Sequence, residues 1–149
     1  MRWALLALSL GLSVVRGADA QRQPGWEVRV PDKVELVTGA SGTVALSIAV
    51  DRGLTVSRDA DVIVDVVTDQ GVTVRKKRLG RRDAVDPEAD APRFAIPVKA
   101  DADGDHTVRL RIRFWLCGGK VCKPIDVRRT ATIAVTAASP VSPPDASVD

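Results

Sequence analysis

Cys117 and Cys122 are the residues of this chain best suited to chemistry, and four residues (Gly-Gly-Lys-Val) separate them. Thiols at this spacing can form a disulfide, exchange with the disulfide of another protein, or bind a soft metal ion. If the four residues form the loop between two antiparallel strands, the cysteines face each other as the last pair before the turn. Directly opposed strand positions lie within disulfide reach, so the spacing favours a hairpin closed by a disulfide.

The side chains around the cysteines bear on whether such a bond would be reactive. Arg113, Lys120 and Lys123 are cationic, and nearby positive charge lowers the pKa of a thiol and favours the thiolate that performs exchange. Trp115 and Pro124 flank the pair and complete the set of residues that could tune it. A bridge that closes about six residues stabilises by only about 2 kcal/mol, so it would be a weak staple. Two interpretations stay open, a redox pair and an inert hairpin clip.

Other kinds of site find little support in the composition. Two thiolates are too few for a closed zinc site, the single histidine, His106, is expected in a solvated polar turn, and no methionine follows Met1. We therefore predict no metal and no cofactor. A basic run at 75–82 is followed directly by an acidic run at 83–90 without interleaved aromatic residues, which favours a solvated edge strand and loop over nucleic-acid binding. The pattern assigns no role to this loop from Arg75 to Asp90.

The N-terminal residues predict export. A positive charge at Arg2 precedes the apolar run 3–15 and the small-residue site Ala18-Asp19-Ala20, which are the three parts of a secretory signal peptide with cleavage after Ala20. The apolar run is too short for a bilayer, which needs about 20 residues, and no later stretch is long enough to span one. We expect a periplasmic or secreted protein, in a compartment where disulfides form and persist.

Apolar residues, mostly valine and isoleucine, recur at every second position along the chain. This alternation predicts strands at 26–30, 43–50, 61–67, 72–79, 93–98, 107–117 and 125–135. In 107–117 it places Cys117 on the outer face, together with Trp115 and three arginines, and leaves the core positions to Val108, Leu110, Ile112, Phe114 and Leu116. Cys122 falls on the outer phase of the next strand. Arg129 interrupts the inward phase of that strand, which predicts a bulge near it.

Short strands separated by regular turn signals are typical of an all-β, immunoglobulin-like sandwich of two sheets, here with about seven to nine strands. We expect one such domain over residues 21–136, after a signal peptide at 1–20. The tail 137–149 holds three prolines and no apolar residue larger than valine, so we expect it to be flexible.

The segment 114–124 (Phe-Trp-Leu-Cys-Gly-Gly-Lys-Val-Cys-Lys-Pro), which runs on into a valine-rich strand, resembles the N-terminal periplasmic domain of DsbD-type thiol:disulfide interchange proteins. That domain is an immunoglobulin-like sandwich with an aromatic residue, a cysteine, a short loop, a second cysteine and a nearby proline. The resemblance extends over about Val34 to Val135.

What the resemblance implies is an electron carrier. Cys117 and Cys122 would be its redox pair, which would exchange disulfides with periplasmic thiol-disulfide proteins and accept electrons from a membrane partner. The alternative, from another class of function, is a non-catalytic sandwich that binds a partner or scaffolds an envelope complex, with the bridge as a structural clip.

Overall fold

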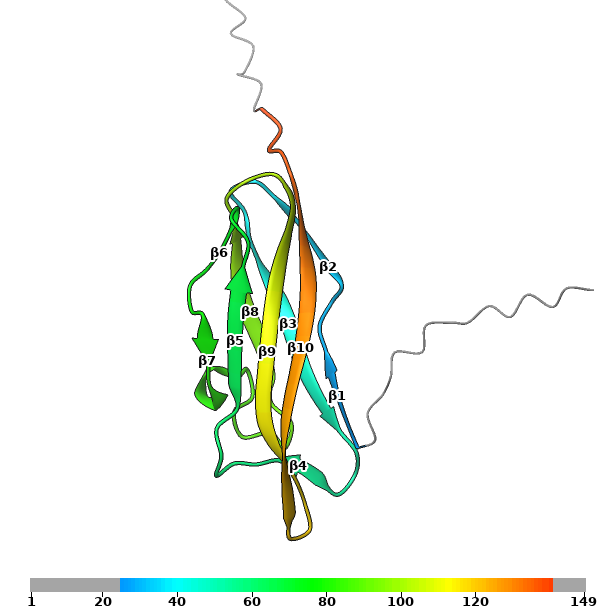
Figure 1. Ribbon diagram of the computed structural model, residues 1–149. Coiled ribbons are helices and arrows are strands. Elements are labelled where there is room, and N and C mark those ends of the chain that lie inside the picture. The colour runs from blue at the N-terminus through cyan, green and yellow to red at the C-terminus, as the bar shows by residue number, and fades with distance from the viewer. Residues whose placement is uncertain (1–24, 141–149) are drawn as a thin grey trace, which may run out of the picture.

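The computed structural model describes residues 25–140, so the predicted signal peptide and most of the predicted tail lie outside the described residues. Most of this part is strand, with one short 3₁₀ helix, η1 (Arg81–Asp83) (Figure 1). The strands are β1 (Trp26–Arg29), β2 (Lys33–Val37), β3 (Ser41–Val50), β4 (Leu54–Val56), β5 (Ile63–Thr68), β6 (Val72–Val74), β7 (Arg78–Leu79), β8 (Arg93–Ala100), β9 (Gly104–Gly118) and β10 (Val121–Thr136).

Two sheets form the predicted immunoglobulin-like sandwich. The first sheet has the order β1-β3-β8-β6, and the second has the order β2-β10-β9-β5-β7, with β4 also paired to β9. All strand pairs are antiparallel except β2 with β10. The fold class is confirmed, and the described residues form ten strands where seven to nine were expected. The predicted strand 72–79 is divided into β6 and β7, and the short strands β2 and β4 were not predicted.

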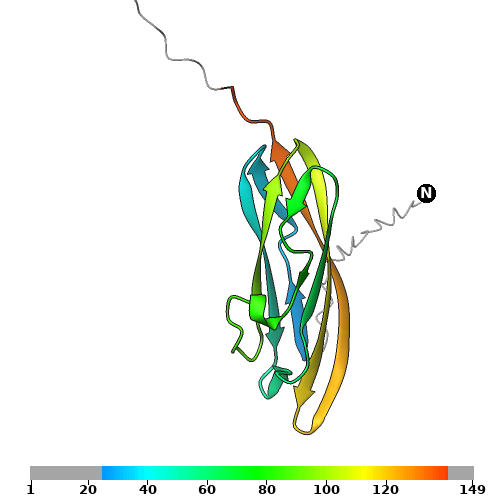
Figure 2. The ribbon, with the colours of Figure 1, turned by 90° about the vertical axis from the view of Figure 1, so that its left-hand side faces the viewer.

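The long β9–β10 hairpin dominates the second sheet and extends past the rest of the molecule at its turn end (Figures 1 and 2). Its register is one-for-one from Gly118 opposite Val121 to Gly104 opposite Val135. The bulge predicted near Arg129 is therefore wrong. Arg129 occupies an inward-facing position without a bulge because its long aliphatic side chain carries the guanidinium out of the core. There, Nε of Arg129 donates to the carbonyl oxygen of Val28 at 3.1 Å.

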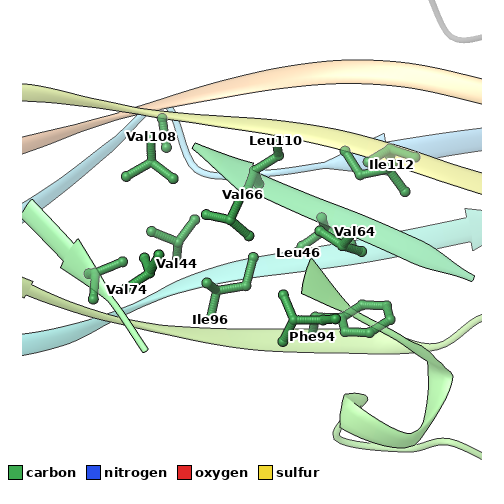
Figure 3. Close-up of a cluster of buried hydrophobic side chains, with 14 of the residues drawn as sticks. Val44, Leu46, Val64, Val66, Val74, Phe94, Ile96, Val108, Leu110 and Ile112 are labelled. Carbon is green, nitrogen blue, oxygen red and sulfur yellow. The ribbon is translucent and has the colours of Figure 1, made fainter. Parts of the chain in front are cut away.

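The core lies between the sheets and is built from the inward positions of both. Figure 3 shows facing valine, leucine, isoleucine and phenylalanine side chains from β3, β5, β6, β8 and β9. All five inward residues predicted for β9 are buried, and no polar or charged residue of the described chain is buried. Phe114 on β9 meets Trp26 on β1 edge to face, with ring centroids 5.8 Å apart, so one aromatic pair joins the two sheets.

The charged segment 75–90 is more fixed than a solvated loop. The half-buried guanidinium of Arg81 donates to four backbone carbonyl oxygens: those of Val56 at 2.9 Å, Ser57 at 2.8 Å, Pro87 at 2.9 Å and Ala89 at 3.1 Å. One cation thus ties the loop to the end of β4.

Two carboxylates of the same segment, those of Asp83 and Asp86, accept hydrogen bonds from neighbouring groups. The hydrogen bond from Lys76, followed by one from the backbone N–H of Gly80, lowers the pKa of Asp83. Hydrogen bonds from the backbone N–H and the side chain of Arg93 lower the pKa of Asp86. The opposite charges that cancel along the sequence therefore also pair in space.

Candidate functional site

Cys117 and Cys122 form a disulfide, with an S–S distance of 2.06 Å and Cα atoms 4.1 Å apart. They are directly opposed on β9 and β10, as their spacing predicted. The loop is shorter than expected, because Gly118 and Val121 also pair and only Gly119 and Lys120 lie outside the strands. Gly119 has a φ of 60°, which suits the first central position of a tight type II′ hairpin turn.

The disulfide lies on the outer face of the sheet, with Cys117 half-buried and Cys122 exposed. The sequence did not predict that β4 runs along the other side of Cys117, where Thr55 is its direct partner. Gly118 allows this approach, since a Cβ atom there would lie 2.5 Å from a methyl carbon of Leu54. Strand β4 therefore covers one flank of the disulfide and leaves the Cys122 side open.

Two of the three cations predicted to tune the thiols, Arg113 and Lys123, are directed away from the disulfide. Arg113 lies four residues before Cys117, about 13 Å along the strand, and its Nη2 donates to Asp65 Oδ2 at 2.7 Å. Lys123 is opposite the buried residue Leu116, so its side chain leaves the hairpin on the face away from the disulfide. Lys120 lies in the turn itself.

Apolar side chains, in contrast, are exposed near the disulfide. Trp115 is 42% exposed and lies directly opposite Pro124, one pair further along the hairpin than Lys123 and Leu116. Val121, at the start of β10, is opposite Gly118 and so lies on the other face of the hairpin, where it is 71% exposed. We call residues 115–124 the hairpin tip. The backbone of Trp115 is held in place, because its carbonyl oxygen accepts a hydrogen bond from the N–H of Ser57 at 2.8 Å.

His106 lies in β9 rather than in a turn, and its ring is not free in solvent. Its Nε2 is 2.9 Å from the carbonyl oxygen of Ala102, and the ring covers Gly71, where a Cβ atom would lie 2.4 Å from Cε1. Across residues 25–140, no three side chains of the metal-binding types His, Cys, Asp and Glu come together. No helix in this part of the chain is long and apolar enough to cross a membrane.

No family model matches the chain, and no curated protein matches it. Among solved structures, a fragment of the α2-macroglobulin of Escherichia coli is similar at 13% identity and a TM-score of 0.42, over 74% of this chain but only 16% of that one. The BIgI domain of the beta protein of S. agalactiae is similar at 13% identity and a TM-score of 0.39, over 76% of this chain and 99% of that one.

A third similar structure is AggA, the major subunit of aggregative adherence fimbriae of Escherichia coli, at 10% identity and a TM-score of 0.34, over 74% of this chain and 93% of that one. With identities and TM-scores this low, none of the three likenesses bears on what this chain does.

Proposed function

We propose that the protein is a non-catalytic binding module of the cell envelope, in which the Cys117–Cys122 disulfide is a structural clip. The observation that carries this proposal is the exposure of Trp115 and Val121 on a hairpin that the disulfide closes. Tryptophan is among the residues that most often dominate a protein interface, and a rigid hairpin loses little entropy when a partner binds. The predicted signal peptide and the disulfide both support a location outside the cytoplasm.

The surroundings of the disulfide also favour the role of a clip. A low thiol pKa needs positive charge held close to sulfur, yet Arg113 is paired with Asp65 and Lys123 leaves from the other face. Strand β4 covers one flank of Cys117. The disulfide holds the two strands together beyond the body of the sandwich, where β4 is the only other strand of residues 25–140 that pairs with the hairpin.

A redox carrier is the second candidate, and the exposure of Cys122 on the outer face favours it. A thiolate of a partner protein would attack one sulfur of this disulfide to form a mixed disulfide. The second thiol of the partner would then resolve the mixed disulfide, so that the partner dithiol is oxidised and this pair is reduced by two electrons and two protons. The partners would be periplasmic thiol-disulfide proteins and a membrane electron donor, as the resemblance to DsbD-type domains implies.

Replacing both cysteines by serine separates the two functions. We expect Cys117→Ser/Cys122→Ser to fold, to lose about 2 kcal/mol of unfolding free energy, and to complement a deletion of the gene fully. Trp115→Ser should fold and fail to complement, because it removes the main exposed apolar side chain of the hairpin tip. Val37→Ser is the matched control, since Val37 is also exposed but lies on β2. A double-serine variant that folds but does not complement would contradict the clip and support the carrier.

Equilibration of the purified protein in thiol-disulfide buffers tests the second candidate directly. A structural bond should have a reduction potential below about −300 mV, because it resists the thiols of its compartment. We expect such a value, measured by trapping the free thiols with a mass-labelled alkylating reagent. A potential near about −200 mV would place the pair among exchanging disulfides and overturn the role of a clip.

A further inference from the structure

The outer face of the second sheet carries a cluster of arginines on strands β9 and β10, which lie in front in Figure 1. Arg109, Arg111 and Arg113 alternate along β9, and Arg111 is directly opposite Arg128 on β10. Like charges in directly opposed positions destabilise a sheet. The opposed pair Arg111 and Arg128 is therefore a candidate for binding an anionic ligand.

The carboxylates on this face do not neutralise all of its cations. Nε of Arg111 donates to Oδ1 of Asp126 at 3.0 Å, and Nη2 of Arg111 donates to Oδ2 of the same carboxylate at 2.6 Å. The other arginines of β9 pair with carboxylates of the neighbouring segments, Arg109 with Asp69 at 3.1 Å and Arg113 with Asp65 at 2.7 Å.

Arg128 is the exception. The hydrogen bond from Arg111 is the main cause of the lowered pKa of Asp126, and the charge of Arg128 also contributes. Within the described residues, however, no carboxylate oxygen lies within 4.0 Å of the Arg128 side chain. Arg128 therefore presents an exposed guanidinium that forms no ion pair in this part of the chain.

A shallow hollow of about 390 Å³ lies beside this guanidinium. Val67 on β5, which is 57% exposed, lines one side of it, Arg109 and Arg111 on β9 lie in the middle, and Arg128 on β10 lines the far side. Thr130 closes it next to Arg109, its direct partner across the hairpin. Asp65 also lines the hollow, but its carboxylate is paired with Arg78 and Arg113. We call this the arginine hollow.

We propose that the arginine hollow binds an acidic, extended segment of a partner protein, with a carboxylate on Arg128 and an apolar side chain against Val67. This inference rests on the proposed function as a binding module and names the chemistry of its partner. Guanidinium groups match carboxylates in geometry as well as in charge. The exposed valine favours a polypeptide over a sulfated polysaccharide, because only the polypeptide supplies an apolar side chain between its anionic groups.

The hollow and the hairpin tip lie along one row of outward residues on β9. Arg109, Arg111, Arg113 and Trp115 are successive outward residues of β9. Trp115 lies six residues from Arg109, about 20 Å along the strand, which an extended segment of about seven residues spans. One partner segment can therefore place its acidic part in the hollow and reach Trp115 with its end.

The test is fluorescence anisotropy of the full chain with a labelled peptide of about seven residues that repeats Glu-Glu-Val-Val, so that each face of the extended peptide carries both residue types. We expect saturable binding that weakens with added salt, since the contacts are between exposed charges. Arg128→Gln should weaken binding about tenfold, the value of one charge-assisted contact, and Val67→Ser should also weaken it severalfold. Arg75→Gln is the matched control, an exposed cation outside the hollow whose loss should leave binding unchanged.

Three results would overturn the inference: no saturable binding of the peptide, an equal loss in Arg75→Gln and Arg128→Gln, or equal binding of a peptide with glutamine in place of glutamate. Heparin and vesicles with anionic lipid are parallel probes. If either binds through Arg128 while the peptide does not, the ligand is another polyanion and the inference fails. Failure of the proposed function is distinct, because it appears as complementation by Trp115→Ser, which keeps the hollow intact.

Discussion

Phe114→Ala is expected to lower the free energy of unfolding by about 4 kcal/mol, the largest single effect we predict. Phe114 is 2% exposed and packs edge to face on Trp26, which belongs to the other sheet. Alanine would leave a cavity between the sheets and remove the aromatic contact, and a close-packed core collapses only partly around such a cavity. Urea denaturation followed by circular dichroism measures the loss.

The neighbouring residue provides the control. Trp115 is at least as large, but it points to the outer face and is 42% exposed. Trp115→Ala should therefore cost less than about 1 kcal/mol, because a partly exposed side chain leaves no cavity when it is truncated. Equal losses in the two variants would show that the inward and outward assignment of β9 is wrong, and with it the position of the disulfide and of the arginine hollow.

Arg81→Ala is expected to cost about 3 kcal/mol, an unusual value for a residue of a charged surface loop. The side chain donates to four backbone carbonyl oxygens, two of them at the end of β4 and two in the loop before β8. Without the guanidinium, these oxygens lose a charged donor in a partly buried place, where an unsatisfied acceptor is costly. Burial and the nearby charge of Arg58 also lower the pKa of Arg81.

Arg82→Ala is the matched control, because Arg82 is the next residue and is exposed. It should change stability by less than about 0.5 kcal/mol. Arg81→Lys should recover little, since an ammonium group cannot reach four carbonyl oxygens with the fixed fork of a guanidinium. If Arg81→Ala and Arg82→Ala unfold at the same urea concentration, the loop is not tied to β4 through Arg81.

We expect the loss of the Arg81 side chain also to destabilise the backbone of β4 beside the disulfide. Arg81 holds the carbonyl oxygens of Val56 and Ser57, and the N–H of Val56 donates to the carbonyl oxygen of Asp90 at 2.7 Å. Strand β4 in turn pairs with β9 at Thr55 and Cys117. In Arg81→Ala, hydrogen exchange should therefore speed up over 54–57, while the core strands β3 and β8 keep their protection.

Much of the fold was predictable because its main signal is local. Alternation along a strand depends only on the strand itself, so the buried set of β9 and the outward position of Cys117 could be predicted without knowing any partner. The facing of Cys117 and Cys122 is local too, since a short loop allows only a hairpin between them. The bulge predicted near Arg129 was wrong because the alternation of residue types does not show how far a long charged side chain can extend.

Local patterning along the chain is enough to predict a two-sheet β domain with one cysteine pair on its outer face. The surroundings of that pair depend on contacts between segments that are distant in sequence. β4 is far from Cys117 in sequence but lies against it, and Arg113 is paired with Asp65 of β5. The opposition of Arg111 and Arg128 likewise follows from the register of β9 against β10. Alternation tells which face a side chain occupies, whereas strand order and register decide which neighbours share that face, and these are set by the packing of the whole sandwich.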